Sequence, residues 1–152
     1  MMEQALGLWR QEGRISVWRY RKAPRMYAGW HFAADKEACT SLLSLCDILS
    51  CEVGPAYRTL TVTDPSTVGA DRIFGQHDLR LDIPAKMRLG NDLDVDGSIG
   101  LVGGILVLPL RPKDILSFSE ALRDLSANHA DFGVGFGSGN TIVKFWWWPE
   151  RV

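Results

Sequence analysis

The spacing of apolar and polar side chains divides the chain into segments that alternate between strand and helix. Residues 14–21 and 26–33 are rich in β-branched and aromatic side chains, which favour strands. The segment 22–25 between them contains a proline, so we expect the two strands to pair as a hairpin. Residues 57–62 and 77–83 alternate apolar with polar side chains, and a period of two is typical of a half-buried strand.

Two amphipathic helices are predicted where apolar residues recur at helical spacing, besides a shorter helix within residues 1–13. The first begins after Asp35, whose carboxylate can accept hydrogen bonds from the unpaired N–H groups of the first turn, and it closes before Gly54. The second begins at Pro112, because proline is tolerated in a first turn. Their apolar stripes are Ala38, Leu42, Leu45 and Leu49 on the first helix, and Ile115, Phe118, Leu122 and Leu125 on the second.

The second half of the chain contains the most apolar stretch. Residues 98–110 predict one central strand, kinked or bulged at the glycine pair 103–104, and residues 84–92 predict a loop before it. Residues 141–149 predict a terminal strand that stops at its proline. The alternate glycines that precede this strand, from residue 133 to residue 139, indicate a flexible loop or a bulged strand.

Both halves of the chain therefore show strands followed by a helix and a further strand. This order predicts an α+β fold, a mainly antiparallel sheet of about six strands with two helices packed on one face. We expect residues 1–152 to form a single domain, as their number allows. Lys36 can be superposed on Lys113 and Leu45 on Leu122, so a ββαβ pseudo-duplication is a further hypothesis.

Composition narrows the class of protein. With 46% apolar and 23% charged residues, the chain has the composition of a globular protein. Its net charge of −1 argues against nucleic acid and anionic lipid as partners. No apolar run approaches the ~20 residues of a membrane-spanning helix. The first residues carry Glu3 and Glu12 and do not resemble a signal peptide, so we expect a cytoplasmic protein.

Three cysteines lie within one predicted helical region, at Cys39, Cys46 and Cys51. An odd number of cysteines on one helix is not a disulfide framework. Cys39 and Cys46 are seven residues apart and share a helix face, so we expect them to be small core residues. Burial raises a thiol pKa, which argues against a catalytic cysteine.

An acidic segment provides the one candidate metal site. Asp92, Asp94 and Asp96 precede a glycine, and carboxylates at alternate positions can converge on a hard cation such as calcium. The twelfth position of the complete calcium loop would fall on Gly103, which has no carboxylate. The alternative is an acidic loop with its aspartates in water. No catalytic triad or paired-carboxylate arrangement can be singled out, and no cofactor is implied.

Aromatic and basic residues mark the candidate binding surface. In the first predicted hairpin, cations alternate with aromatic rings, and the terminal strand contains three consecutive tryptophans. Such sheet faces can bind macromolecules. The alternative is that the arginines stack on tryptophans or pair with acidic residues in the region 71–96, and that the tryptophans fill the core. The predicted binding residues are Trp18, Arg19, Tyr20, Arg21, Trp30, Trp146, Trp147 and Trp148.

These features favour a non-enzymatic protein-binding or accessory domain, for example a bacterial toxin-neutralising protein. Its partner would be another protein or a second copy of the chain. The competing hypothesis is a small metal-dependent or ligand-binding enzyme centred on Asp92–Asp96 and His77.

Overall fold

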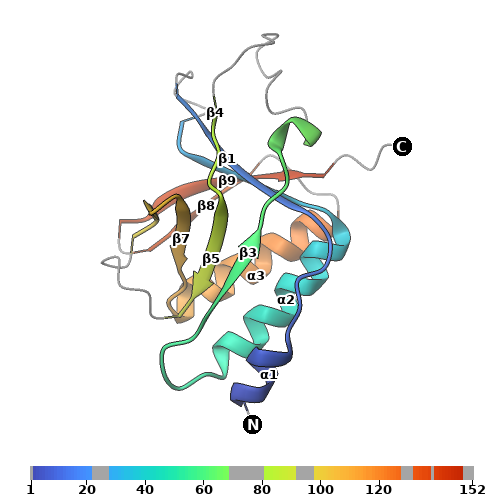
Figure 1. Ribbon diagram of the computed structural model, residues 1–152, viewed down its shortest axis with the longest axis vertical. Helices are drawn as coiled ribbons and strands as arrows, with labels where there is room; N and C mark the ends of the chain where they lie inside the picture. Colours follow the sequence, from blue (N-terminus) through green and yellow to red (C-terminus); the bar gives the residue numbers. More distant parts are fainter. Residues whose placement is uncertain are drawn as a thin grey trace.

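The computed structural model describes residues 2–21, 28–68, 81–91, 98–127, 132–137 and 139–148. Figure 1 shows the arrangement of the elements in these ranges. In chain order they are α1 (Met2–Leu8), β1 (Ile15–Tyr20), β2 (Trp30–Ala34), α2 (Lys36–Ser50), β3 (Tyr57–Thr61), the 3₁₀ helix η2 (Pro65–Val68), β4 (Leu81–Asp82), β5 (Lys86–Gly90), β6 (Gly100–Val102), β7 (Ile105–Pro109), α3 (Pro112–Ser126), β8 (Phe132–Phe136) and β9 (Thr141–Trp147).

The strands form two mixed, mostly antiparallel sheets, which confirms the predicted α+β class. Sheet A has the order β4-β1-β2-β9-β8, and sheet B has the order β3-β5-β7-β6. Each sheet contains one parallel pair at its centre, β2 with β9 in sheet A and β5 with β7 in sheet B. The strands are thus divided between two sheets, where the sequence predicted one.

The two sheets and the two long helices enclose a common hydrophobic core. Sheet A crosses the upper part of the molecule, while sheet B lies in front of α2 and α3 (Figure 1). Phe32 of β2 and Phe145 of β9 each contact Phe118 of α3, with ring centroids 5.7 Å and 6.2 Å from it. Met87 and Leu108 of sheet B belong to the same buried cluster. The apolar stripes of both helices are buried in this cluster, as their helical spacing predicted.

The topology of the chain is duplicated. The helices α2 and α3 are each 15 residues long and begin 76 residues apart, at Lys36 and Pro112. At this shift, Leu42 corresponds to Phe118 and Leu49 to Leu125, and all four are buried. The superposition of Lys36 on Lys113 corresponds to a shift of 77, at which Leu45 matches Leu122 and both are also buried, so the residue-by-residue equivalence stays a hypothesis.

The two halves exchange hairpins. Hairpin β1-β2 of the first half joins sheet A beside β8-β9 of the second half, while β3 and β5 join sheet B beside β6-β7. The parallel pairs β2/β9 and β5/β7 are equivalent, because each joins a strand of the first half to a strand of the second half. Each sheet is therefore built from both halves, with β4 and η2 as additions to the first half.

Two sequence predictions for residues 84–110 were wrong. Residues 84–92 were expected to be a loop, but Lys86–Gly90 form the inner strand β5. Residues 98–110 were expected to be one strand, but they form the hairpin β6-β7. Gly103 and Gly104 both have positive φ values, 58° and 81°, and two such residues make the tight turn that joins antiparallel strands. The turn predicted at 22–25 and most of the strand predicted at 77–83 lie outside the described residues.

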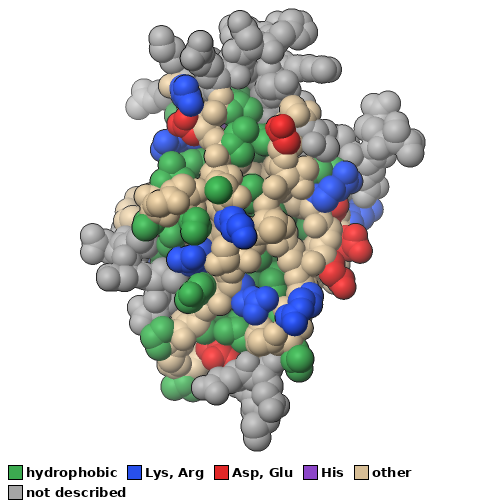
Figure 2. All heavy atoms as spheres, in the orientation of Figure 1, with side chains coloured by type: hydrophobic (Ala, Val, Ile, Leu, Met, Phe, Trp, Pro, Cys, Tyr) green, Lys and Arg blue, Asp and Glu red, His purple; other side chains and the backbone are tan. Residues whose placement is uncertain are grey.

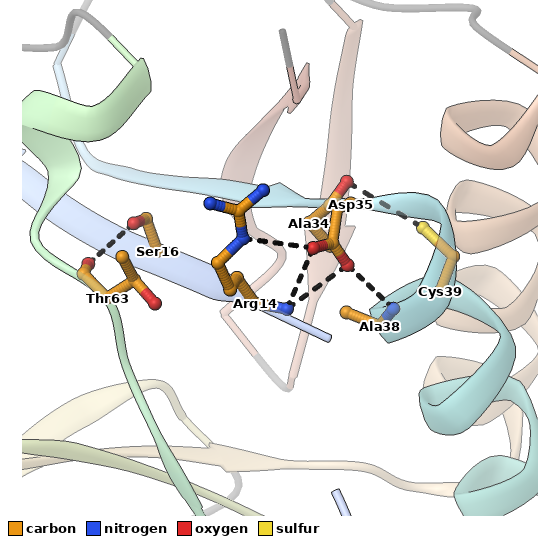
Figure 3. A network of polar contacts seen from close by, with 7 residues as sticks. All are labelled: Arg14, Ser16, Ala34, Asp35, Ala38, Cys39 and Thr63. Atoms are coloured by element: carbon orange, nitrogen blue, oxygen red, sulfur yellow. Dashed lines mark hydrogen bonds and ion pairs between the residues drawn. The ribbon is translucent and has the colours of Figure 1, made fainter. Parts of the chain in front are cut away.

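A network of hydrogen bonds lies at the start of β1 and the start of α2, and it includes Thr63, which follows β3 (Figure 3). Asp35 is the N-cap of α2, as predicted, and its Oδ1 accepts a hydrogen bond from Ala38 N at 2.8 Å. Both carboxylate oxygens also accept from Arg14 N at 3.1 Å. Ser16 Oγ donates to Thr63 O at 2.6 Å. The bonds of Asp35 join the start of β1 to the start of α2, and the bond from Ser16 connects the segment after β3 to sheet A.

Candidate functional site

The outer face of sheet A carries a second, smaller buried cluster formed by several of the predicted binding residues. Trp18 is only 2% exposed, and Tyr20 and Trp148 are also buried. Trp18 stacks on the fully buried His31 with a centroid distance of 5.4 Å and an interplanar angle of 10°. Trp146 Nε1 donates a hydrogen bond to His31 Nδ1 at 2.8 Å. These aromatic side chains are packed against one another.

The predicted arginines also have partners within the protein. Arg19 lies over the buried Trp30, with its guanidinium carbon 4.6 Å from the ring centroid. Asp82 accepts from Arg21 Nε at 2.8 Å and from Arg19 Nη2 at 3.1 Å. The hydrogen bond from Arg21 is the main reason that the pKa of Asp82 lies below its ordinary value. This is the arrangement that the alternative interpretation described. The predicted role of these residues in binding stays a prediction.

The remaining predicted residues are not brought together in the described parts of the chain. Trp147 belongs to β9, where its backbone is registered with Ala34. His77, Asp92, Asp94 and Asp96 lie outside the described residues. Among the residues that are described, no three histidine, cysteine, aspartate or glutamate side chains are grouped so that they could hold a metal ion.

The cysteines lie where the sequence predicted. Cys39 and Cys46 are buried on α2, whereas Cys51 is exposed. Burial is the main cause that raises the pKa of Cys39 to about 12 and that of Cys46 to about 11. Both thiols are therefore protonated at neutral pH and are poor nucleophiles.

A hollow of about 540 Å³ lies between the end of α2 and the start of α3. Its wall is mainly apolar and includes Leu49, Leu110 and Leu116. Among the described residues of this wall, Glu52 has the one titratable side chain. Asn91 is already engaged, since its side chain accepts from Ala56 N at 2.8 Å and donates to Gly54 O at 3.1 Å. The described residues of the wall also include Ser50, but no histidine, lysine or arginine that could act as a base beside it.

The outer face of sheet B is more exposed at β3 and β5 than the outer face of sheet A, although Val107 of β7, in register with Arg88, is buried. On β3 the outward residues are Tyr57, Thr59 and Thr61, and on β5 they include Lys86 and Arg88, because the alternate residues Leu60 and Met87 are buried in the core. Tyr57 is 51% exposed. Arg88 reaches across to β3, where its guanidinium carbon lies 4.8 Å from the centroid of the Tyr57 ring and its Nε donates to Thr59 Oγ1 at 3.1 Å.

This part of the surface is basic. Arg58 donates to Leu6 O and Trp9 O at 3.3 Å and 3.2 Å, and Arg10 also donates to Trp9 O, at 2.9 Å. Figure 2 shows Lys and Arg side chains gathered over β3 and β5, with acidic side chains toward the margins of the view. We use the term basic face for Arg10, Arg58, Lys86 and Arg88, which surround strand β3. Lys86 and Arg88 lie on the outer face of sheet B, and Arg58 lies on the other side of β3, beside Trp9.

The cations of the basic face differ from the other arginines in their partners. Arg14, Arg19, Arg21 and Arg111 each form an ion pair with an aspartate. The four cations of the basic face form no ion pair with a carboxylate in the described part of the chain; three of them bond to carbonyl or hydroxyl oxygens or lie over rings.

Strand β3 is also an edge of sheet B. The carbonyl of Ala56, the residue before β3, accepts a hydrogen bond from Asn91 N. In an antiparallel pair every second residue bonds to the partner strand, so Tyr57, Thr59 and Thr61 direct their backbone N–H and C=O groups away from β5. At Thr61 the side chain of Gln11 takes the place of a neighbouring strand. It accepts from Thr61 N at 2.9 Å and donates to Thr61 O at 2.9 Å. Among the described residues, the outward backbone groups of Thr59 have no such partner.

The sequence interpretation missed Lys86 and Arg88 as surface residues of a strand. The signal was present, since Met87 and Leu89 alternate with these two cations. The alternation is short and lies between Pro84 and Asn91, both residues that favour loops, so the local pattern alone predicts a loop.

No protein-family model matches this chain, and neither a curated protein nor a solved structure is significantly similar to it. Among the described helices, none is both long enough and apolar enough to span a membrane.

Proposed function

We propose that the chain is a non-enzymatic protein-binding domain that receives an acidic partner on its basic face. The observation that supports this function is the set of four cations without carboxylate partners among the described residues, beside the exposed ring of Tyr57. Complementary charge speeds the encounter of two proteins and selects the partner. Arginine and tyrosine are also enriched among the residues that contribute most to protein interfaces.

An acidic protein suits this surface better than a nucleic acid does. The chain has a net charge of −1, so its long-range field does not attract a polyanion. Single-stranded nucleic acids require several aromatic rings on which bases can stack, and among the described residues Tyr57 is the one exposed aromatic side chain beside the basic face. The free edge of β3 offers backbone groups that match a polypeptide.

The basic face is also a better candidate than the aromatic cluster on sheet A. Trp18 and Trp148 are buried, so a substitution there changes the packing of the fold before it changes a contact with a partner. We also propose a cytoplasmic location, which agrees with Cys39 and Cys46 being free thiols.

The test uses a fluorescein-labelled peptide of glutamate and glycine, with a lysine and glycine peptide for comparison, and fluorescence anisotropy as the readout. We expect the acidic peptide to bind more tightly, and the affinity to fall as salt is added because the charges are screened. Lys86→Glu together with Arg88→Glu should weaken binding by about tenfold or more, since two attractive charges become repulsive.

Lys113→Glu is the matched control, because it reverses an exposed lysine on α3. It should leave the affinity within about twofold of the unmodified protein. Equal loss of binding in the Lys113→Glu protein, or equal affinity for the acidic and basic peptides, would contradict the proposed function. Thermal melting of each variant shows whether its fold is intact.

A further inference from the structure

The geometry points to an extended acidic segment of the partner that binds as an additional strand along the free edge of β3. This inference rests on the function proposed above and specifies how the acidic partner is held. In this mode of recognition, backbone hydrogen bonds provide affinity and alternate side chains provide specificity.

The edge of β3 already forms hydrogen bonds with a side chain in the place where a neighbouring strand would lie. The amide group of Gln11 forms one donor and one acceptor bond with Thr61, which is the pattern that a neighbouring backbone would form. Thr59 presents the same pair of backbone groups two residues earlier, and Tyr57 follows at the same spacing. A partner strand that pairs with Thr59 and Tyr57 thus extends along β3 the hydrogen-bond pattern that the side chain of Gln11 forms at Thr61.

Positive charge lies on both faces of this edge. Arg88 covers the outer face of β3, where it contacts Tyr57 and Thr59. Arg58 lies on the opposite face, with its guanidinium carbon 5.6 Å from the centroid of the Trp9 ring, and Arg10 shares the Trp9 carbonyl with it. Successive side chains of an added strand point to opposite faces, so acidic residues at neighbouring positions would each meet a cation.

The experiment compares two labelled octapeptides in which pairs of glutamates alternate with pairs of valines, so that acidic side chains reach both faces. One peptide has free backbone amides, and the other has alternate amides N-methylated. The two peptides carry the same charge, but the methylated peptide cannot donate along one edge. We expect the free peptide to bind at least about tenfold more tightly, and to slow amide hydrogen exchange at Thr59.

Two substitutions at Thr59 separate the backbone from the side chain. Thr59→Pro removes the outward N–H, and proline is tolerated on an edge strand where that N–H does not bond within the sheet. Thr59→Val removes the hydroxyl that Arg88 contacts but keeps the N–H. We expect Thr59→Pro to weaken binding about tenfold and Thr59→Val to weaken it less than about threefold.

The outcomes distinguish this inference from the function on which it rests. Equal binding of both peptides overturns strand addition, and so does full affinity in a folded Thr59→Pro protein. If the Lys86→Glu, Arg88→Glu protein still loses binding in that case, an acidic partner remains supported. Failure of every acidic peptide to bind overturns both. If Thr59→Pro unfolds the protein, the methylated peptide and the exchange rate of Thr59 decide the question.

Discussion

At the scale of single residues, the buried carboxylate of Asp114 holds neighbouring backbone segments together. Asp114 is 1% exposed and lies in the first turn of α3. It accepts from Arg111 N at 3.0 Å, from Arg111 Nε at 2.9 Å and from Gly137 N at 3.2 Å. Burial raises the pKa of Asp114, but the bonds from Arg111 and Gly137 outweigh burial and leave this pKa below its ordinary value. The carboxylate thus connects α3 to the turn after β8.

The lowered pKa of Asp114 predicts a pH-dependent contribution to stability. A carboxyl group with a lowered folded-state pKa stabilises the protein above its unfolded pKa of about 4, and this contribution is lost as the pH falls through the folded pKa. We expect Asp114→Asn to lower the free energy of unfolding by about 1–3 kcal/mol at pH 7. The difference from the unmodified protein should shrink below about pH 4.

Urea denaturation of both proteins between pH 7 and pH 2.5 measures this difference. Glu120→Gln, an exposed change on the same helix, is the control and should change stability little at any pH. A difference between Asp114→Asn and the unmodified protein that stays constant with pH would show that the charge of Asp114 does not contribute.

At the scale of elements, the helices are set by local pattern and the strands by their neighbours. The stripe of α2, from Ala38 to Leu49, has a period that only a helix satisfies, and its N-cap is a local feature. The strand β5 has only Met87 and Leu89 as apolar markers and depends on β3 and β7 to complete its hydrogen bonds. Edge strand β3 in turn depends on the side chain of Gln11 at Thr61.

Gln11 provides a test of how this edge is protected. Gln11→Ala should lower the free energy of unfolding by about 1 kcal/mol and speed hydrogen exchange at Thr61, because the backbone of Thr61 loses both partners. Gln11→Glu keeps an acceptor for Thr61 N–H but lacks the donor, so exchange at Thr61 should stay slow. Exchange followed by NMR measures both effects. Similar exchange rates at Thr61 in all three proteins would rule out protection by Gln11.

At the scale of the whole molecule, the exchange of hairpins makes the two halves interdependent. Sheet A needs β8 and β9 beside β2, and sheet B needs β6 and β7 beside β5. Phe32 of the first half and Phe118 of the second half meet in the core, with ring centroids 5.7 Å apart. Neither half can cover its apolar surface without the other.

This interdependence predicts the behaviour of fragments. Residues 1–97 and 98–152, made separately, should each be largely unfolded by circular dichroism, because each lacks the strands that pair with its own. An equimolar mixture should regain structure, and Phe118→Ala in the second fragment should reduce the recovery, since Phe118 is fully buried. Cooperative thermal unfolding of either fragment alone would contradict the exchanged arrangement.

The sequence by itself determined the α+β class, both long helices, the cap at Asp35, the core position of Cys39 and Cys46, and the terminal strand. These features depend on the order of residues within one element, where period and capping act over a few positions. Only the tertiary structure decided that the strands form two sheets, that Trp18 and Trp148 are buried, and that Lys86 and Arg88 face solvent. Strand pairing joins segments far apart in the chain, so the exposed face of each strand depends on neighbours that its own residues do not specify.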